Sequence, residues 1–253
     1  MNDAIILSDL HLGSENCRAR ELWQFLERIR DGKLATRRII LNGDVFDSID
    51  FRRLKKNHWK VLSTIRKLSD EVETIWVHGN HDGEFELISH LLGVSVVDRY
   101  VFKSGGKLCL CLHGHQFDEF IRRYRVTTWL ADQGYRFLQK LDSTHTFARF
   151  AKRKSKVFLR NLEAIESGAL MAAQESAVEI VCCGHTHVAT SRTVGGIQYG
   201  NSGCWTETPS HYLTVDGGRV FLHTHDAMAE TVRDEFLTDA FDQRPWGGVL
   251  ALR

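Results

Sequence analysis

The first third of the chain alternates between short apolar runs and longer segments in which apolar residues recur every three or four positions. The short runs, residues 4–7, 38–41 and 74–77, predict strands that are buried on both faces. The longer segments, residues 20–30 and 54–68, have the spacing of amphipathic helices. Strands that alternate with helices in this way predict βαβ units and a largely parallel sheet.

Paired apolar runs joined by glycine dominate the rest of the chain. Residues 100–112, 189–199 and 211–223 each contain two such runs around a Gly-Gly pair, which predicts β-hairpins. Another apolar run, residues 178–183, predicts a further strand. The fold class expected from the whole pattern is therefore α/β, with antiparallel strands contributed by the second half.

A long basic segment without proline, residues 119–175, separates the first hairpin from the later strands. Its apolar bulk and its few strand signals predict a helical insert that elaborates the core. We therefore expect one domain over residues 1–225, with this insert as a cap. Residues 226–253 are expected to form a C-terminal tail that packs outside the core.

The composition is that of an ordinary globular protein, since 43% of the 253 residues are hydrophobic and 26% are charged. A formal net charge of +1 disfavours nucleic acid as a partner and leaves room only for a local basic patch. No apolar run is long enough to span a membrane and no signal-peptide pattern is present, so we expect a cytoplasmic protein. The placement of cysteines inside strand-like runs favours buried free thiols over disulfides.

Residue types that commonly bind metals follow five of the predicted strands. Because the carboxyl ends of strands in open α/β sheets face one crevice, the five loops can converge on one point. Each block alone is a weak signal, because aspartate and histidine at strand ends often bond only to backbone. The five blocks are Asp9-x-His11, Gly43-Asp44-x-x-Asp47, Gly79-Asn80-His81-Asp82, His113-Gly114-His115 and Gly184-His185-x-His187.

These blocks offer more ligands than one tetrahedral ion can use. A carboxylate such as Asp44 can bridge two ions, which together can hold a phosphate and activate a water. Nitrogen and oxygen ligands without thiolate suit manganese, iron or zinc and, less well, magnesium. The candidate ligands are Asp9, His11, Asp44, Asn80, His113, His185 and His187.

In this order the blocks resemble the calcineurin-like metallophosphoesterases, over residues 5–223. The resemblance implies a four-layer α/β/β/α sandwich around a centre of two divalent ions, with manganese the most expected. It implies that one ion is held by Asp9, His11, Asp44 and His187, and the other by Asp44, Asn80, His113 and His185. It also implies that His81 lies beside the scissile phosphate as the catalytic histidine, and that Asp47 orients it.

Within this family, the blocks at Asn42–Asp47 and His113–Asp118 and the insert are most similar to the UDP-2,3-diacylglucosamine diphosphatases of lipid A biosynthesis. The resemblance implies hydrolysis of a phosphodiester or pyrophosphate bond, with a nucleotide-linked lipid as the leading substrate. The insert would then cap the acyl chains, at the inner face of the cell membrane. Its basic residues that would contact anionic groups are Arg122, Arg123, Lys152 and Lys154.

The sequence also departs from that branch, whose members carry arginine in place of His81 and commonly aspartate in place of His115. His81 restores the general phosphoesterase pattern, and His115 is open to three roles: extra ligand, substrate contact or polar loop residue. A general phosphodiesterase or nuclease on soluble substrates therefore stays as an alternative. A non-catalytic scaffold is the third alternative, although the expected ligands and His81 are all present. The oligomeric state is left open.

Overall fold

The structure is a computed structural model, and it describes residues 1–48, 50–83, 86–118 and 156–225. Most of the predicted insert and the whole predicted tail, residues 226–253, lie outside this range. The basic residues predicted to contact substrate also lie outside it, namely Arg122, Arg123, Lys152 and Lys154. The division into domain, cap and tail therefore stays a prediction.

The first of two sheets has six strands in the order β11-β10-β1-β2-β3-β4. Strands β1 to β4 are parallel to one another, and β10 and β11 extend the sheet as an antiparallel hairpin. The strands are β1 (Ala4–Leu7), β2 (Arg38–Asn42), β3 (Glu73–Val77), β4 (Ser95–Val97), β10 (Ser210–Asp216) and β11 (Arg219–His225).

The second sheet has five strands in the order β5-β6-β7-β9-β8. Its central strands β6, β7 and β9 are parallel, and β5 and β8 are antiparallel hairpin partners at the two edges. The predicted hairpins are thus confirmed. The strands are β5 (Arg99–Ser104), β6 (Lys107–Leu112), β7 (Ile180–Cys183), β8 (Thr190–Val194) and β9 (Ile197–Asn201).

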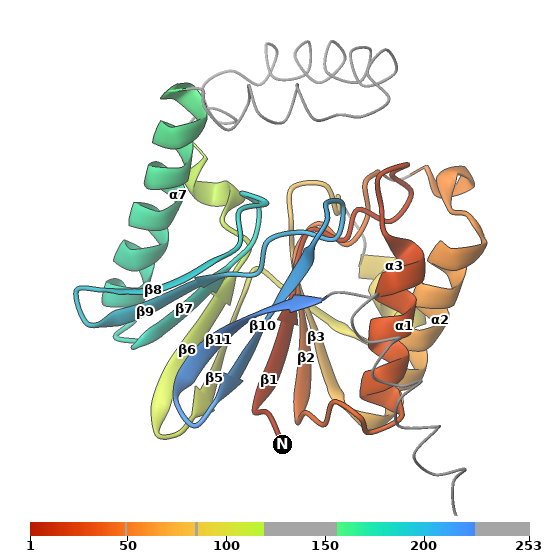
Figure 1. The fold of residues 1–253 in the computed structure, drawn as a ribbon, viewed down its shortest axis with the longest axis horizontal. Coiled ribbons are helices and arrows are strands. Elements are labelled where there is room, and N and C mark those ends of the chain that lie inside the picture. The colour runs from red at the N-terminus through yellow and green to blue at the C-terminus, as the bar shows by residue number, and fades with distance from the viewer. Residues whose placement is uncertain (49, 84–85, 119–155, 226–253) are drawn as a thin grey trace, which may run out of the picture.

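Helices cover the outer faces of both sheets and complete a four-layer α/β/β/α sandwich (Figure 1). The first sheet is covered by α1 (Ala19–Arg30), α2 (Lys56–Glu71) and α3 (Glu86–Leu92). The second sheet is covered by α7 (Lys156–Glu175), which is the end of the predicted insert. Two short 3-10 helices, η1 (Phe51–Arg53) and η2 (His115–Phe117), lie in loops. The fold expected from the sequence is therefore confirmed.

Three apolar clusters hold the layers together, and strand β1 shows how the sequence builds them. Ile5 and Leu7 pack toward the helices of the first layer, whereas Ala4 and Ile6 pack between the two sheets. Because successive side chains point to opposite faces, a strand buried on both faces must be apolar throughout. The cysteines of β6 and β7 are buried in these clusters, and all six cysteines are free thiols, as expected.

The sequence pattern did not indicate α3 or β4. Helix α3 has only seven residues and β4 only three, too few for a periodicity to be visible. Among the described residues, no helix has the length and hydrophobicity needed to cross a bilayer.

Helix α7 packs unusually closely on η2, and this contact can be tested. A Cβ atom at Gly168 would lie 2.4 Å from Cγ of Phe117. Gly168→Ala should therefore destabilise the protein by about 1–3 kcal/mol through overpacking. Without this contact the same change should stabilise the helix by about 1 kcal/mol, so the sign of the change in a urea unfolding experiment is decisive. Exposed Ser167→Ala on the same helix is the control and should cost nothing measurable.

Candidate metal centre

The five predicted loops meet at the carboxyl ends of β1, β2, β3, β6 and β7. Most of the candidate ligands come together there in three overlapping groups, each with its ligand atoms within 4.8 Å of one another. His11 and Asp44 each belong to two of the groups, so the groups form one continuous cluster. The groups are Asp9, His11 and His187; His11, Asp44 and His81; and Asp44, His113 and His185.

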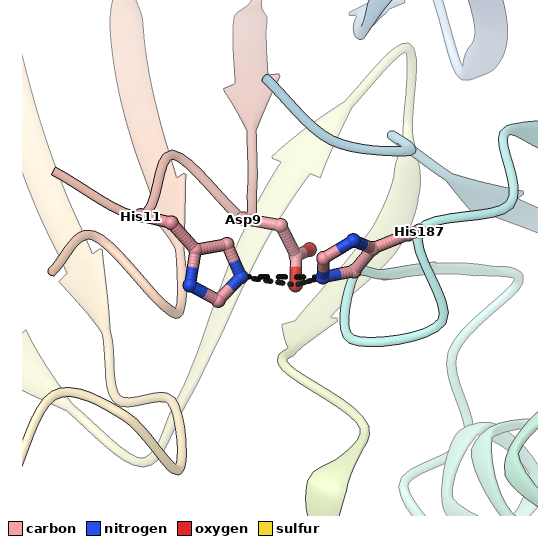
Figure 2. Close-up of side chains that lie close together, drawn as sticks. All are labelled: Asp9, His11 and His187. Atoms are coloured by element: carbon pink, nitrogen blue, oxygen red, sulfur yellow. Dashed lines mark hydrogen bonds and ion pairs between the residues drawn. The ribbon is translucent and has the colours of Figure 1, made fainter. Parts of the chain in front are cut away.

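In the first group, one nitrogen from each histidine and one carboxylate oxygen face a common point (Figure 2). Nε2 of His187 lies 3.2 Å from Nε2 of His11 and 3.2 Å from Oδ1 of Asp9. Nε2 of His11 is also 3.9 Å from Oδ1 of Asp9 and 3.9 Å from Oδ2 of Asp44. Three donor atoms directed at one point are the arrangement that a metal ion requires.

In the group formed with His185, Asp44 is the shared carboxylate. Its Oδ2 lies 3.3 Å from Nε2 of His113. That nitrogen is fully buried and makes no hydrogen bond to any described residue. A buried polar atom without a hydrogen bond is costly unless a ligand satisfies it. Asn80 occupies an exposed position in the adjacent loop, and its part in binding stays a prediction.

The cluster is electrostatically suited to a cation. Asp9 and Asp44 are 0% and 2% exposed, so both carboxylates are removed from water. Burial alone would raise the pKa of Asp9, but His187 outweighs it and lowers that pKa to about 2. Burial also acts to lower the pKa of His113, but Asp44 and Asp9 raise it to about 9. The carboxylates thus attract positive charge to this point, which fits divalent metal ions.

The backbone around the cluster is held in a strained conformation. Among the described residues, six other than glycine have a positive φ, and five of them are candidate ligands. The left-handed conformation costs a non-glycine residue roughly 1–2 kcal/mol and is concentrated at functional sites. The five are Asp9, His11, Asp44, His185 and His187, with φ between 47° and 66°.

The loop that carries Asp44 is held in place by Asp82, a residue for which the sequence suggested no role. Oδ2 of Asp82 accepts hydrogen bonds from the backbone N–H of Asp44 (3.0 Å) and Gly79 (2.8 Å) and from Nε1 of Trp76 (3.0 Å). Its Oδ1 accepts from the N–H groups of Val45 and Phe46. One buried carboxylate therefore gathers five donors and joins the loops after β2 and β3.

Gly79 permits the same two loops to approach closely. A Cβ atom at this position would lie 2.2 Å from the backbone nitrogen of Asp44 and 2.3 Å from its Oδ1. Any side chain at position 79 would therefore push Asp44 away, and only glycine fits.

His81 lies beside the first group, with its ring 5.1 Å from that of His11. Its Nδ1 donates a hydrogen bond to the backbone carbonyl of Asp47 (3.1 Å). The carboxylate of Asp47 instead lies 3.7 Å from Nδ1 of His11 and 2.5 Å from Nη1 of Arg53. The contact of Asp47 with His81 is thus made by the main chain rather than by the side chain.

Ring nitrogens of two other candidate ligands are also held by neighbouring groups. Nδ1 of His113 donates to the carbonyl of Asn42 (2.8 Å), and Nε2 of His185 donates to Oδ2 of Asp118 (2.9 Å). Cys204 lies against the ring of His187. The sequence could have indicated Asp118, which ends the His113 block, but nothing in the pattern pointed to Cys204.

His115 lies outside all three groups. Its ring is 5.6 Å from that of His113 and 6.4 Å from that of His185. Burial and the neighbouring His113 and His185 lower its pKa to about 4. His115 therefore lies beside the cluster without joining any of its three groups.

A cavity of about 460 Å³ opens beside His187. Its lining includes Phe158, Leu159 and Leu162 from the first part of α7, together with Val188 and Pro209. Cys204, Glu207 and His211 add polar groups. The cavity is thus continuous with the candidate ligands and largely apolar.

The sequence matches the family model described as "Calcineurin-like phosphoesterase" over residues 4–189. A comparison with curated proteins finds no match. Similar solved structures include a novel archaeal phosphodiesterase (15% identity, TM-score 0.49, covering 88% of this chain and 99% of that chain). They also include the phosphoesterase Yfce from E. coli (16%, 0.48, 84% and 87%) and a predicted phosphoesterase from Streptococcus pneumoniae (18%, 0.42, 88% and 98%).

Asp82→Asn tests the junction between the loops. The amide nitrogen cannot accept hydrogen bonds, so several buried N–H groups lose their partner. Each such loss costs about 1–3 kcal/mol, and we expect the free energy of unfolding to fall by at least about 3 kcal/mol, measured by urea denaturation. Asp70→Asn, at an exposed aspartate paired with Arg66, is the control and should change it by less than about 0.5 kcal/mol. Equal effects of the two changes would contradict the role of Asp82.

Proposed function

Because the chain belongs to the calcineurin-like phosphoesterase family, we propose that it hydrolyses a phosphodiester or pyrophosphate bond with two divalent metal ions. The observation that carries the proposal is the position of Asp44, which groups with His113 and His185 and whose Oδ2 also lies 3.9 Å from Nε2 of His11 in the group with Asp9 and His187. One carboxylate shared between two groups is what a two-ion centre needs. We propose that Asp9, His11, Asp44 and His187 hold one ion, and that Asp44, Asn80, His113 and His185 hold the other.

When bound, such ions supply positive charge to the phosphate and lower the pKa of a water molecule that attacks phosphorus. Manganese is the expected ion, with iron, zinc or magnesium as alternatives, because the ligand groups offer nitrogen and oxygen. The thiol of Cys204 is in none of these groups.

His81 is proposed as the catalytic acid. Its Nδ1 is committed to the carbonyl of Asp47, so Nε2 is the nitrogen that can exchange a proton with the leaving oxygen. Asp47 would position this ring through its main-chain carbonyl. A general acid of this kind contributes about 10²–10⁴ to the rate.

The leading substrate is a phosphate ester that carries an apolar group, such as UDP-2,3-diacylglucosamine. The cavity beside His187 supports this choice, because its apolar wall on α7 can receive an aliphatic chain. The insert would act as a cap, with Arg122, Arg123, Lys152 and Lys154 toward anionic groups of the substrate. Such a protein would work in the cytoplasm, in contact with the inner face of the membrane.

A general phosphodiesterase on soluble substrates is the second candidate. His81 favours it, because the diacylglucosamine diphosphatases carry arginine at this position. The two candidates differ in what the cavity binds, not in the proposed chemistry.

Hydrolysis of bis-p-nitrophenyl phosphate tests the reaction class. Chelation should abolish the activity, and Mn²⁺ should restore it. His81→Ala should lower kcat by about 10²–10⁴ with both ions still bound, whereas Asp44→Ala should reduce the number of bound ions measured by elemental analysis. Exposed His90→Ala is the control and should behave as wild type. Full activity of chelated protein or of His81→Ala would contradict the mechanism.

Release of UMP from UDP-2,3-diacylglucosamine in detergent tests the substrate class. Phe158→Ser and Leu162→Gln should each raise KM for this substrate about tenfold, the equivalent of about 1.4 kcal/mol of lost apolar contact. Neither should change turnover of bis-p-nitrophenyl phosphate. Met171→Gln, an exposed position on the same helix, is the matched control. Turnover of the small diester alone would instead favour the general phosphodiesterase.

A further inference from the structure

We propose that Asp118 is a positioning residue that fixes the ring of His185, so that Nδ1 of this ring is the nitrogen available to a metal ion. The proposal rests on the two-ion centre proposed above and assigns a role to a residue outside it. Asp118 follows η2, immediately before the predicted insert, whereas His185 follows β7 in the second sheet. The sequence places them 67 residues apart, and the structure brings them into contact.

The hydrogen bond between the two side chains determines the tautomer of His185. Nε2 of His185 lies 2.9 Å from Oδ2 of Asp118, and Asp118 is only 4% exposed. A carboxylate oxygen accepts from a ring N–H, so this contact places a proton on Nε2. The lone pair that a metal needs is then on Nδ1.

Asp118 is itself held by the helix that closes the insert. Nδ2 of Asn161 on α7 donates to the same Oδ2 at 2.9 Å. The neighbouring Phe117 packs against Gly168 of α7, and a Cβ atom at Gly114 would lie 3.3 Å from Ile165. Because α7 contacts both ends of η2, the carboxylate of Asp118 has little freedom to move away from His185.

The main chain of His185 is fixed by a second contact. Its N–H donates to Oδ2 of Asp9 at 2.9 Å. A Cβ atom at Gly184 would lie 2.7 Å from the same oxygen, so the chain passes as close to Asp9 as glycine allows. With its backbone tied to Asp9 and its ring tied to Asp118, His185 has one orientation.

Asp118 also differs from the partners of the other candidate ligands. His113 donates to a neutral carbonyl, that of Asn42, and Nδ1 of His11 is 3.7 Å from Asp47 and makes no hydrogen bond to a described residue. A carboxylate that accepts from a histidine makes the histidine a stronger ligand, and removing such a partner typically costs 10–100-fold in metal affinity. Asp118 should therefore raise the affinity for the ion that His185 binds.

Ring-nitrogen NMR of the metal-free protein tests the positioning without any ion. We expect the His185 ring, assigned with His185→Gln, to carry its proton on Nε2 in wild type. Asp118→Ala should give a mixture of tautomers. Asp118→Asn should keep the wild-type tautomer, because its side-chain carbonyl still accepts from Nε2. An unchanged tautomer in Asp118→Ala would overturn the proposal.

Titration with Mn²⁺ by calorimetry tests the consequence. Asp118→Ala should lower the affinity for one of the two ions 10–100-fold and leave the affinity for the other unchanged. Asn161→Ala should lower the affinity for the same ion by a smaller factor. Exposed Glu163→Gln on α7 is the control. If Asp118→Ala does not fold, the same two measurements on Asn161→Ala test the proposal. Wild-type metal affinity and a wild-type His185 tautomer in Asn161→Ala would contradict it. A wild type that binds no ion would refute the two-ion centre, whereas wild-type binding by a folded Asp118→Ala would refute only the role of Asp118.

Discussion

Two carboxylates removed from water, Asp9 and Asp44, impose the constraint on which the rest of the site depends. A buried charge is costly unless paired charge or hydrogen bonds compensate it. Here the compensation comes from histidines, whose pKa values the carboxylates raise in the case of His113 and His187. The two buried carboxylates thus concentrate negative charge at one point, which a bound cation would compensate further.

The four layers make this concentration of charge possible. The parallel strands of both sheets end on the same side, so loops from two separate sheets supply one site. The loops reach it only through left-handed residues and a close backbone approach at Gly79. Asp82 offsets part of this strain, because one carboxylate satisfies five donors, four from the loops after β2 and β3 and one from Trp76 in β3.

Helix α7 contacts both the candidate metal centre and the cavity proposed to bind the substrate. Its first turns line the cavity beside His187, and Asn161 in the same region bonds to Asp118 next to His185. One helix therefore contacts the neighbourhood of both proposed ions. The close packing of α7 on η2 would also limit the movement of Asp118 beside His185.

Much of the fold could be predicted from the sequence, because strands buried on both faces must be wholly apolar and amphipathic helices must repeat every three to four residues. The pattern therefore located β1, β2, β3 and the three hairpins, and the residues after the strands indicated a metal site by their type and order. Short elements such as α3 and β4 left no visible period.

The partners of the ligands were decided by tertiary structure alone. Asp118 meets His185 across 67 positions, and Asp47 turns its carboxylate toward His11 while its carbonyl meets His81. Contacts of this kind depend on how the layers pack and how the loops turn, so they cannot be predicted from a local pattern of residues.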